Sequence, residues 1–247
     1  MLEVRNLSLT YPNGKQALTS VNLSVQPGEL VILLGGNGSG KTTMLRCLTR
    51  TLQPSSGQVI VDGCDLTGLQ GEKLRQARMS LALISQHPSL VRRRSVRANV
   101  ASGALGHYSD TLTALGRVPR PELESASHFL AEVGLEHLAE QRASTLSGGQ
   151  AQRVSIARAL AQRPRALLAD EPIASLDPEA SEEIMRLLKR LAKTDNLAVL
   201  CVLHQVDLAL DHADRVVGIR HGKVDFDLSR DDISRDRVRN LYLSEAA

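Results

Sequence analysis

Alternating hydrophobic and polar residues open the chain. From residue 2 to residue 11 a hydrophobic side chain recurs at roughly every second position, which is typical of a β-strand with one buried face. The Asn-Gly pair at 13–14 predicts a tight turn, and residues 21–25 alternate again. We therefore expect antiparallel strands at the start of the chain. The hydrophobic positions of the first strand are Leu2, Val4, Leu7, Leu9 and Tyr11.

Short, mainly hydrophobic runs recur along the rest of the chain. Such runs are typical of strands buried on both faces of a parallel sheet. Residues 56–66 and 214–224 favour hairpins, a helix is expected from about Thr42, and residues 178–193 form an amphipathic helical pattern. The hydrophobic runs lie at residues 30–34, 79–86, 166–171 and 197–203.

The segment from about residue 87 to residue 146 has a different character. It is polar and favours helix, and it contains prolines at 88, 119 and 121. We expect it to form a helical subdomain inserted between strands of the sheet. No hydrophobic run approaches the ~20 residues of a membrane span. The charged, alternating N-terminus is expected to be a strand and not a signal peptide.

Composition narrows the class of protein. The 247 residues fit one domain with an insertion, or two small domains. A net charge of +3, with three tyrosines, two phenylalanines and no tryptophan, argues against nucleic-acid binding. The cysteines at 47, 64 and 201 form no C-x-x-C pair. We therefore expect neither a disulfide framework nor a zinc site, and a reducing cytosol as the compartment.

A glycine-rich loop follows the hydrophobic run at 30–34. Its sequence, GGNGSGKTT at 35–43, has the spacing Gly-x4-Gly-Lys-Thr and opens an expected helix. This is the context of a P-loop, in which backbone N–H groups and Lys41 hold phosphates and Thr42 binds Mg²⁺. The alternative is a glycine turn beside a surface lysine.

Two carboxylates end the hydrophobic run at 166–171. A strand that ends in Asp170 delivers this side chain to the metal of a P-loop site. Glu171 comes next, where it could polarise an attacking water as a general base. The alternative is a simple pair of acids at a strand end.

The loop LSGGQ at residues 146–150 is a second candidate anion site. Ser147 is a good N-cap, and Gly148 and Gly149 open an expected helix. Exposed N–H groups and the helix dipole favour an anion there. Unlike the P-loop, this loop contains no lysine, so it predicts a weak site when it acts alone.

The P-loop, LSGGQ, the strand ending in Asp-Glu, SLD at 175–177 and a histidine after the next strand together resemble the ATP-binding-cassette (ABC) ATPases. The resemblance covers most of the chain. It implies an α/β fold: a P-loop NTPase (RecA-like) core with an antiparallel β subdomain and an inserted helical subdomain. It also implies a head-to-tail homodimer, in which LSGGQ of one copy caps ATP on the P-loop of the other.

The resemblance also implies roles for four further positions. Tyr11 matches the aromatic residue that stacks on adenine, although it could be a simple strand-end aromatic. Gln86 matches the glutamine that senses Mg²⁺ and water. Asp177 lies in the loop that crosses the dimer interface, and His204 matches the histidine that contacts the γ-phosphate, although an isolated strand-end histidine is usually structural.

These assignments define the expected site and its division along the chain. We expect ATP and Mg²⁺ as the cofactors. The expected segments are 1–86 and 166–225 for the core, 87–165 for the helical subdomain with LSGGQ, and 226–247 for a short C-terminal tail. The catalytic residues are expected to be Glu171, His204 and Gln86, and the metal ligands Thr42, Gln86 and Asp170. The nucleotide-binding residues are expected to be Tyr11, Gly35, Gly36, Asn37, Gly38, Ser39, Gly40, Lys41, Thr42, Thr43, Ser147, Gly148, Gly149, Gln150 and Asp177.

Within the ABC ATPases, residues 142–181 and LHQVDLAL at 203–210 look like the ATPase subunits of phosphonate, phosphite or hypophosphite importers. The resemblance implies a membrane permease and, indirectly, a periplasmic binding protein as partners. It places the chain peripherally at the cytoplasmic face of the inner membrane. The alternatives are the ATPase of another importer, of an exporter or lipoprotein-release system, and, more remotely, a soluble ABC ATPase.

Three successive arginines, Arg92 to Arg94, follow the expected glutamine loop. They lie on the surface that should meet the permease. The alternative is a solvated basic turn.

Overall fold

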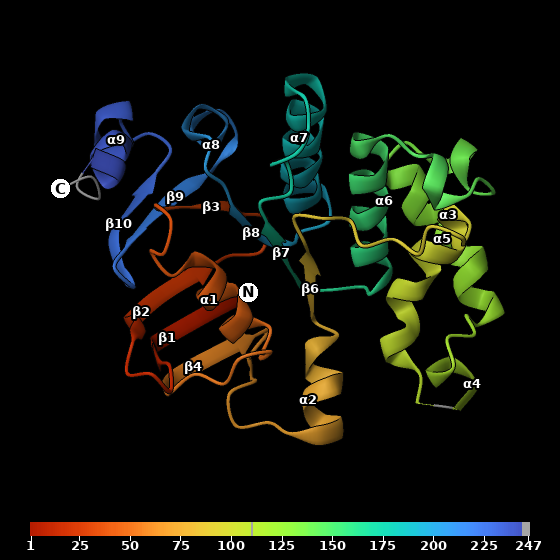
Figure 1. Cartoon of the computed structure of the whole chain (residues 1–247), viewed down its shortest axis with the longest axis horizontal. Coiled ribbons are helices and arrows are strands. Elements are labelled where there is room, and N and C mark those ends of the chain that lie inside the picture. The colour runs from red at the N-terminus through yellow and green to blue at the C-terminus, as the bar shows by residue number, and fades with distance from the viewer. Residues whose placement is uncertain (110, 244–247) are drawn as a thin grey trace.

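Two β-sheets and a group of helices make up the protein in the computed structural model, which describes residues 1–109 and 111–243. The six-stranded sheet crosses the middle of the molecule in Figure 1. The four-stranded sheet lies at the lower left and the helical subdomain at the right. The α/β architecture expected from the sequence is confirmed.

The six-stranded sheet is the central scaffold. Neighbouring strands are parallel except for β10, which is antiparallel to β9. Strand β8 is buried at every position, as its unbroken hydrophobic run predicts. In spatial order the strands are β10 (Lys223–Ser229), β9 (Arg215–Arg220), β3 (Leu30–Leu34), β8 (Ala198–Val202), β7 (Ala166–Asp170) and β6 (Leu81–Ile84).

The antiparallel sheet confirms the alternation at the start of the chain. Strand β1 pairs with β2 on one side and with β4 on the other. Register shifts interrupt both pairings, which explains why the hydrophobic positions do not alternate strictly. In spatial order the strands are β2 (Gln16–Val25), β1 (Leu2–Thr10), β4 (Ser56–Val61) and β5 (Cys64–Asp65).

Helices cover the central sheet, and an inserted helical subdomain lies beside it (Figure 1). The helices of the core are α1 (Lys41–Leu48), α2 (Gly71–Arg78), α7 (Pro178–Thr194), α8 (Val206–His212) and α9 (Arg235–Leu243). The inserted subdomain contains α3 (Val96–Ala101), η1 (Ser102–His107), α4 (Thr111–Ala114), α5 (Arg120–Glu132), η2 (Glu136–Leu138), η3 (Ala143–Thr145) and α6 (Gly148–Ala161).

The C-terminal boundary expected after residue 225 falls inside β10 and needs correction. Strand β10 continues to Ser229 because Phe226 is buried in the main core, with Arg237 of α9 over its ring. Val238 and Leu241 of α9 are buried in the same core. The segment after the sheet therefore begins after Ser229. Residue 110 and residues 244–247 of the expected segments lie outside the described part of the chain.

Strand β3 divides the hydrophobic core into two. Leu30 and Ile32 face a cluster that includes the helices α6 and α7. Val31 and Leu33 face the opposite cluster, which joins the sheet to α1 and to the antiparallel strands. Successive residues of a strand point to opposite faces, so β3 packs against both hydrophobic clusters at once. The glycine loop that follows β3 is therefore anchored to both.

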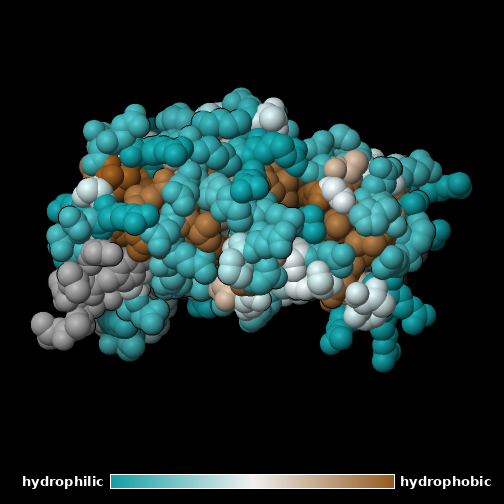
Figure 2. Space-filling view, turned by 90° about the horizontal axis from the view of Figure 1, so that it is seen from above, coloured by the Kyte–Doolittle hydropathy of each residue, from teal (hydrophilic) through white to brown (hydrophobic). Residues whose placement is uncertain are grey.

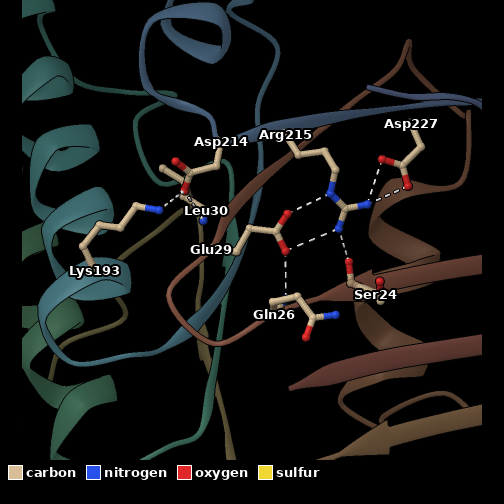
Figure 3. Close-up of polar contacts among 8 residues, drawn as sticks. All are labelled: Ser24, Gln26, Glu29, Leu30, Lys193, Asp214, Arg215 and Asp227. Carbon is tan, nitrogen blue, oxygen red and sulfur yellow. Dashed lines mark hydrogen bonds and ion pairs between the residues drawn. The ribbon is translucent and has the colours of Figure 1, made fainter. Parts of the chain in front are cut away.

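A polar cluster joins the two sheets at the amino ends of the parallel strands (Figure 3). Arg215 Nε donates to Glu29 Oε1 over 2.8 Å, and its Nη1 donates to both carboxylate oxygens of Asp227. Its Nη2 donates to the carbonyl oxygen of Ser24, on β2 of the other sheet. Burial lowers the pKa of Arg215, but the hydrogen bonds and charges of Glu29 and Asp227 outweigh it and raise the pKa.

The surface is mainly hydrophilic where Figure 2 shows it, with hydrophobic residues in separate areas between polar ones. Among the described residues, no helix has both the length and the hydrophobicity to cross a bilayer.

Candidate functional site

A cavity of about 250 Å³ lies where the carboxyl ends of β3, β7 and β8 approach one another. In open parallel sheets this edge is the usual place for a ligand. The cavity brings together the glycine loop and residues that are far apart in the sequence. Its lining residues are Tyr11, Lys15, Ala17, Asn37, Gly38, Ser39, Gly40, Lys41, Thr42, Thr43, Glu171 and His204.

The glycine loop is shaped for close approach. A Cβ on Gly35 would lie 2.4 Å from the carbonyl oxygen of Ile219, so no larger residue fits there. Gly40 has a φ of 114°, a conformation that side chains rarely adopt. Gly38 also has a positive φ, and a Cβ there would meet nothing within 4 Å. The buried Ser39 Oγ has no hydrogen-bond partner among the described residues, so the loop retains polar capacity for a ligand.

Lys41 lies at the start of α1, against the glycine loop. Its side chain is 5% exposed, and Nζ donates to the carbonyl oxygens of Gly35 and Gly36 over 2.7 and 2.8 Å. These bonds hold the amine at the loop, where a bound anion would meet it. Its neighbour Thr42 is exposed to the cavity.

Tyr11 forms one wall of the cavity. It follows β1, and its hydroxyl lies 3.1 Å from Oγ1 of Thr43 on α1. This contact fixes the antiparallel sheet to the helix that follows the glycine loop. Tyr11 thus lines the same cavity as Lys41.

Glu171 and His204 also line the cavity. Oε1 of Glu171 lies 2.7 Å from Nε2 of His204, which follows β8. Glu171 has a φ of 49°, in the left-handed region. Such backbone strain is concentrated at functional sites.

Asp170 ends β7, next to Glu171. Burial and the charge of Glu171 raise its pKa, whereas Arg46, Lys41 and His204 act in the opposite direction. A cation would offset the cost of this half-buried carboxylate. The hydroxyl of Thr42 and the carboxylate of Asp170 are oxygen donors of the kind that Mg²⁺ prefers alongside substrate phosphates. The chemistry of these two donors therefore fits the expected metal, although Asp170, unlike Thr42 and Glu171, is not part of the cavity lining.

The loop LSGGQ is well formed but does not line this cavity. Ser147 caps α6: its hydroxyl accepts from the N–H of Gln150, and the Gln150 side chain accepts from the N–H of Ser147. Ser147 and Gly148 are exposed. The start of α6 is therefore exposed to solvent at Ser147 and Gly148. It does not contribute to the cavity that the P-loop of the same chain lines.

The two glycines of this loop pack against the start of α7. A Cβ on Gly148 would lie 3.3 Å from Cδ2 of Leu176, and one on Gly149 would lie 3.2 Å from Cβ of Ala180. Asp177 is the N-cap of α7, where its side chain accepts from the N–H of Ala180. LSGGQ and the Asp177 loop are thus neighbours within one chain.

Gln86 is exposed and does not line the cavity. It follows β6 and begins the crossing to the helical subdomain. Helix α6 holds this crossing, because Gln152 donates to the carbonyl oxygen of Ser85 and Arg158 donates to those of Pro88 and Ser89. Burial lowers the pKa of Arg158.

Sequence reasoning missed Lys15 and Ala17 in the cavity lining. They lie on the far side of the β1–β2 turn from Tyr11. The Asn-Gly turn predicts that the two strands fold back on each other, which places Lys15 across from Tyr11. This pairing is the sequence signal that could have indicated Lys15 as a lining residue. No motif marks either residue.

A buried parallel strand, a glycine loop, a lysine at the start of a helix and an acidic neighbouring strand end define a P-loop nucleotide-binding fold. The sequence profile described as "ABC transporter" matches residues 18–174, well over half of the chain. The chain therefore belongs to the ABC transporter family of ATP-binding proteins.

Individual relatives extend the match to nearly the whole chain. The Phosphonates import ATP-binding protein PhnC of Treponema denticola is 45% identical over 92% of this chain and 89% of its own length. PhnC 3 of Halalkalibacterium halodurans is 40% identical and covers 98% of this chain and 94% of its own.

Solved structures of ATP-binding cassettes also match. The cassette MJ0796, solved as a dimer in a post-hydrolysis state bound to ADP and Pi, gives a TM-score of 0.79 with 31% identity, covering 93% of this chain and 99% of its own. The cassette MJ1267 in its ADP conformation gives a TM-score of 0.86 with 26% identity over 98% of both chains.

Proposed function

We propose that this chain is the ATP-hydrolysing subunit of an ABC importer for a phosphonate-class anion: a phosphonate, phosphite or hypophosphite. The observation that carries the proposal is that one cavity is lined by the glycine loop, by Tyr11 and by the Glu171–His204 pair. The phosphonate class is supported by the names of the relatives that align over nearly the full chain.

In this proposal the chain's own residues bind, orient and hydrolyse ATP. The backbone N–H groups of residues 35–43 and the Lys41 amine hold the phosphates, and Tyr11 stacks on the base. Glu171 accepts a proton from the attacking water, and His204 orients the γ-phosphate while its hydrogen bond positions Glu171. Mg²⁺, held by Thr42 and Asp170, would neutralise charge on the phosphates; the expected third ligand, Gln86, lies outside the cavity lining.

The proposed active form is a head-to-tail homodimer. Ser147 and Gly148 of LSGGQ are exposed and do not line their own chain's cavity, so they can meet the γ-phosphate on a second copy. Its N-terminal amides and helix dipole complement an anion that brings its own metal and lysine. A related cassette has been solved as a dimer with ADP and Pi.

Two variants test the split site. Lys41→Ala should remove ATP binding, measured by calorimetry on the isolated chain. Ser147→Arg should abolish hydrolysis but leave ATP bound to the monomer, because the cavity with Lys41 and Tyr11 is untouched. Loss of both binding and hydrolysis in a folded Ser147→Arg protein would contradict the arrangement across two chains.

The proposed partners are a membrane permease and, through it, a periplasmic binding protein, with the chain peripheral at the cytoplasmic face of the membrane. Arg92 and Arg93 are exposed. The carbonyl oxygens of Arg92 and Arg94 accept from the N–H groups of Ser144 and Ala143. The arginine turn is thereby tied to the segment that leads into LSGGQ, so a permease that binds the turn could act on that loop.

The transport proposal is tested in vesicles that contain the chain, its permease and its binding protein. Methylphosphonate, phosphite or hypophosphite should stimulate ATP hydrolysis, and stimulation by sulfate or an amino acid instead would contradict the substrate class. A triple variant in which Arg92, Arg93 and Arg94 are all replaced by Ser should uncouple transport and spare the basal ATP hydrolysis of the isolated chain. Normal transport in that variant would leave the arginines as a solvated turn.

A further inference from the structure

Lys15 is a second cation at the candidate nucleotide cavity. The cavity lining contains two lysines, Lys15 and Lys41. The amine of Lys41 is buried and bonded to the carbonyl oxygens of Gly35 and Gly36. Lys15, in contrast, is exposed at the Tyr11 side of the cavity, so its ammonium group can approach a ligand from solvent.

The backbone around Lys15 is held rigidly. In the β1–β2 turn, the N–H of Tyr11 donates to the carbonyl oxygen of Lys15 over 2.9 Å. The N–H of Gly14 donates to the carbonyl oxygen of Tyr11, and the N–H of Lys15 donates to Oδ1 of Asn13. These bonds set Lys15 directly across the turn from Tyr11.

The turn is in turn fixed to the glycine loop. The Tyr11 hydroxyl contacts Thr43. The backbone of Ala17 lies close to Gly40, because a Cβ added to Gly40 would be only 2.8 Å from the carbonyl oxygen of Ala17. The Lys15 side chain therefore starts from a point whose position relative to the phosphate loop is set. A lysine on a fixed backbone loses less freedom on binding than one on a mobile loop.

We propose that Lys15 binds the α-phosphate of the nucleotide. This inference rests on the proposed function, in which Tyr11 holds the base and Lys41 holds the terminal phosphates. In a nucleotide the α-phosphate lies between those two ends, and Lys15 lines the cavity next to Tyr11. Lysine is a strong phosphate binder because it brings a full charge and three donors. Because ADP and ATP share the α-phosphate, Lys15 should strengthen the binding of both.

The test compares ligands in calorimetry on the full chain. Lys15→Met removes the charge and keeps the length of the side chain, so the Kd of ADP and that of ATP should each rise about three- to tenfold, the range of about one ordinary net hydrogen bond. Lys15→Arg should restore most of the affinity. Pyrophosphate, which has no α-phosphate, should bind both proteins equally.

Salt and a distant lysine provide the controls. The effect of Lys15→Met on ADP should shrink as ionic strength rises. Lys73→Met, which removes an exposed lysine of α2 outside the cavity, should change no Kd. An unchanged Kd for ADP in Lys15→Met, a loss confined to ATP, or an equal loss for pyrophosphate would each overturn the assignment. If wild type and Lys41→Ala bind ATP alike, the proposed site itself fails.

Discussion

The two edges of the parallel sheet use polar residues in opposite ways. At the carboxyl edge, buried Ser39 Oγ has no partner among the described residues, burial raises the pKa of Asp170, and Glu171 has a φ of 49°. At the amino edge, the Arg215 side chain reaches two carboxylates and a backbone carbonyl (Figure 3). The carboxyl edge has a polar group left for a ligand, whereas at the amino edge the polar groups of the Arg215 cluster are hydrogen-bonded to one another within the protein.

The contrast separates function from stability along strands that are only about five residues long. A polar group that awaits a ligand costs folding free energy until the ligand arrives. A polar group that is satisfied at its own edge joins the layers and has nothing left to bind. The sheet can therefore carry a strained residue at its carboxyl edge, while the Arg215 cluster joins the layers at its amino edge.

The largest expected effect is at the carboxyl edge and concerns activity. Glu171→Gln removes the proposed base but keeps the size and hydrogen-bonding reach of the side chain. Turnover should fall about 10²- to 10⁴-fold, while ATP binding and the free energy of unfolding change little. Unhydrolysed ATP should then hold an ATP-dependent dimer on size exclusion, where wild type runs as a monomer.

Asp170→Asn is the matched control for this variant. It should weaken Mg²⁺ binding, so that no ATP-stabilised dimer accumulates. Near-normal turnover in Glu171→Gln, or a loss of ATP binding like that of Asp170→Asn, would rule out the general-base role of Glu171.

The second effect is at the amino edge and concerns stability. Arg215→Met leaves Glu29, Asp227 and the Ser24 carbonyl without their shared donor. Because the arginine side chain is only 20% exposed, the free energy of unfolding should fall by about 2–3 kcal/mol. ATP affinity should stay as in wild type. Urea unfolding with and without ATP measures both quantities.

Arg186→Met is the comparison for Arg215. Arg186 pairs with Glu182 on the surface of α7 and is 71% exposed, so its loss should cost less than about 0.5 kcal/mol. If the two variants were equally stable, the amino-edge cluster would not be the element that joins the sheets.

The third effect reverses the sign of the second. Without nucleotide or metal, Asp170 is a half-buried carboxylate next to another carboxylate, so its charge opposes folding. Asp170→Asn should therefore raise the free energy of unfolding by about 1 kcal/mol, within the usual range for stabilising substitutions. Loss of the Asp170 charge would then stabilise the protein at the carboxyl edge, whereas loss of the Arg215 charge destabilises it at the amino edge. A lower stability of Asp170→Asn in urea would contradict this difference between the edges.

The carboxyl edge could be predicted from the sequence because its residues lie in short motifs. Residues 35–43 and 170–171 are local runs whose order reflects strand, loop and helix, and the same holds for LSGGQ at 146–150, which lies outside the cavity. Most strands were also predicted, since hydrophobic patterns are local. The roles of the motif residues remain predictions.

The parts that were missed lack a local pattern. Helix α2 has no buried residue, so no hydrophobic period marks it. The amino-edge cluster joins residues 24, 29, 215 and 227, which only the folded chain brings together. Lys15 enters the cavity through the return of a hairpin, again a relation between strands. In each case the signal is in the tertiary structure.

The smallest effect sharpens what makes the amino edge stable. Nζ of Lys193 lies 3.0 Å from Oδ2 of Asp214, but the lysine side chain is 53% exposed. The same carboxylate oxygen also accepts from the N–H of Leu30 at the start of β3, and Lys193→Met leaves that bond intact. The expected loss is therefore below about 0.5 kcal/mol and should disappear at high salt. A loss as large as that of Arg215→Met would mean that net charge, and not hydrogen bonding across the two sheets, stabilises this edge.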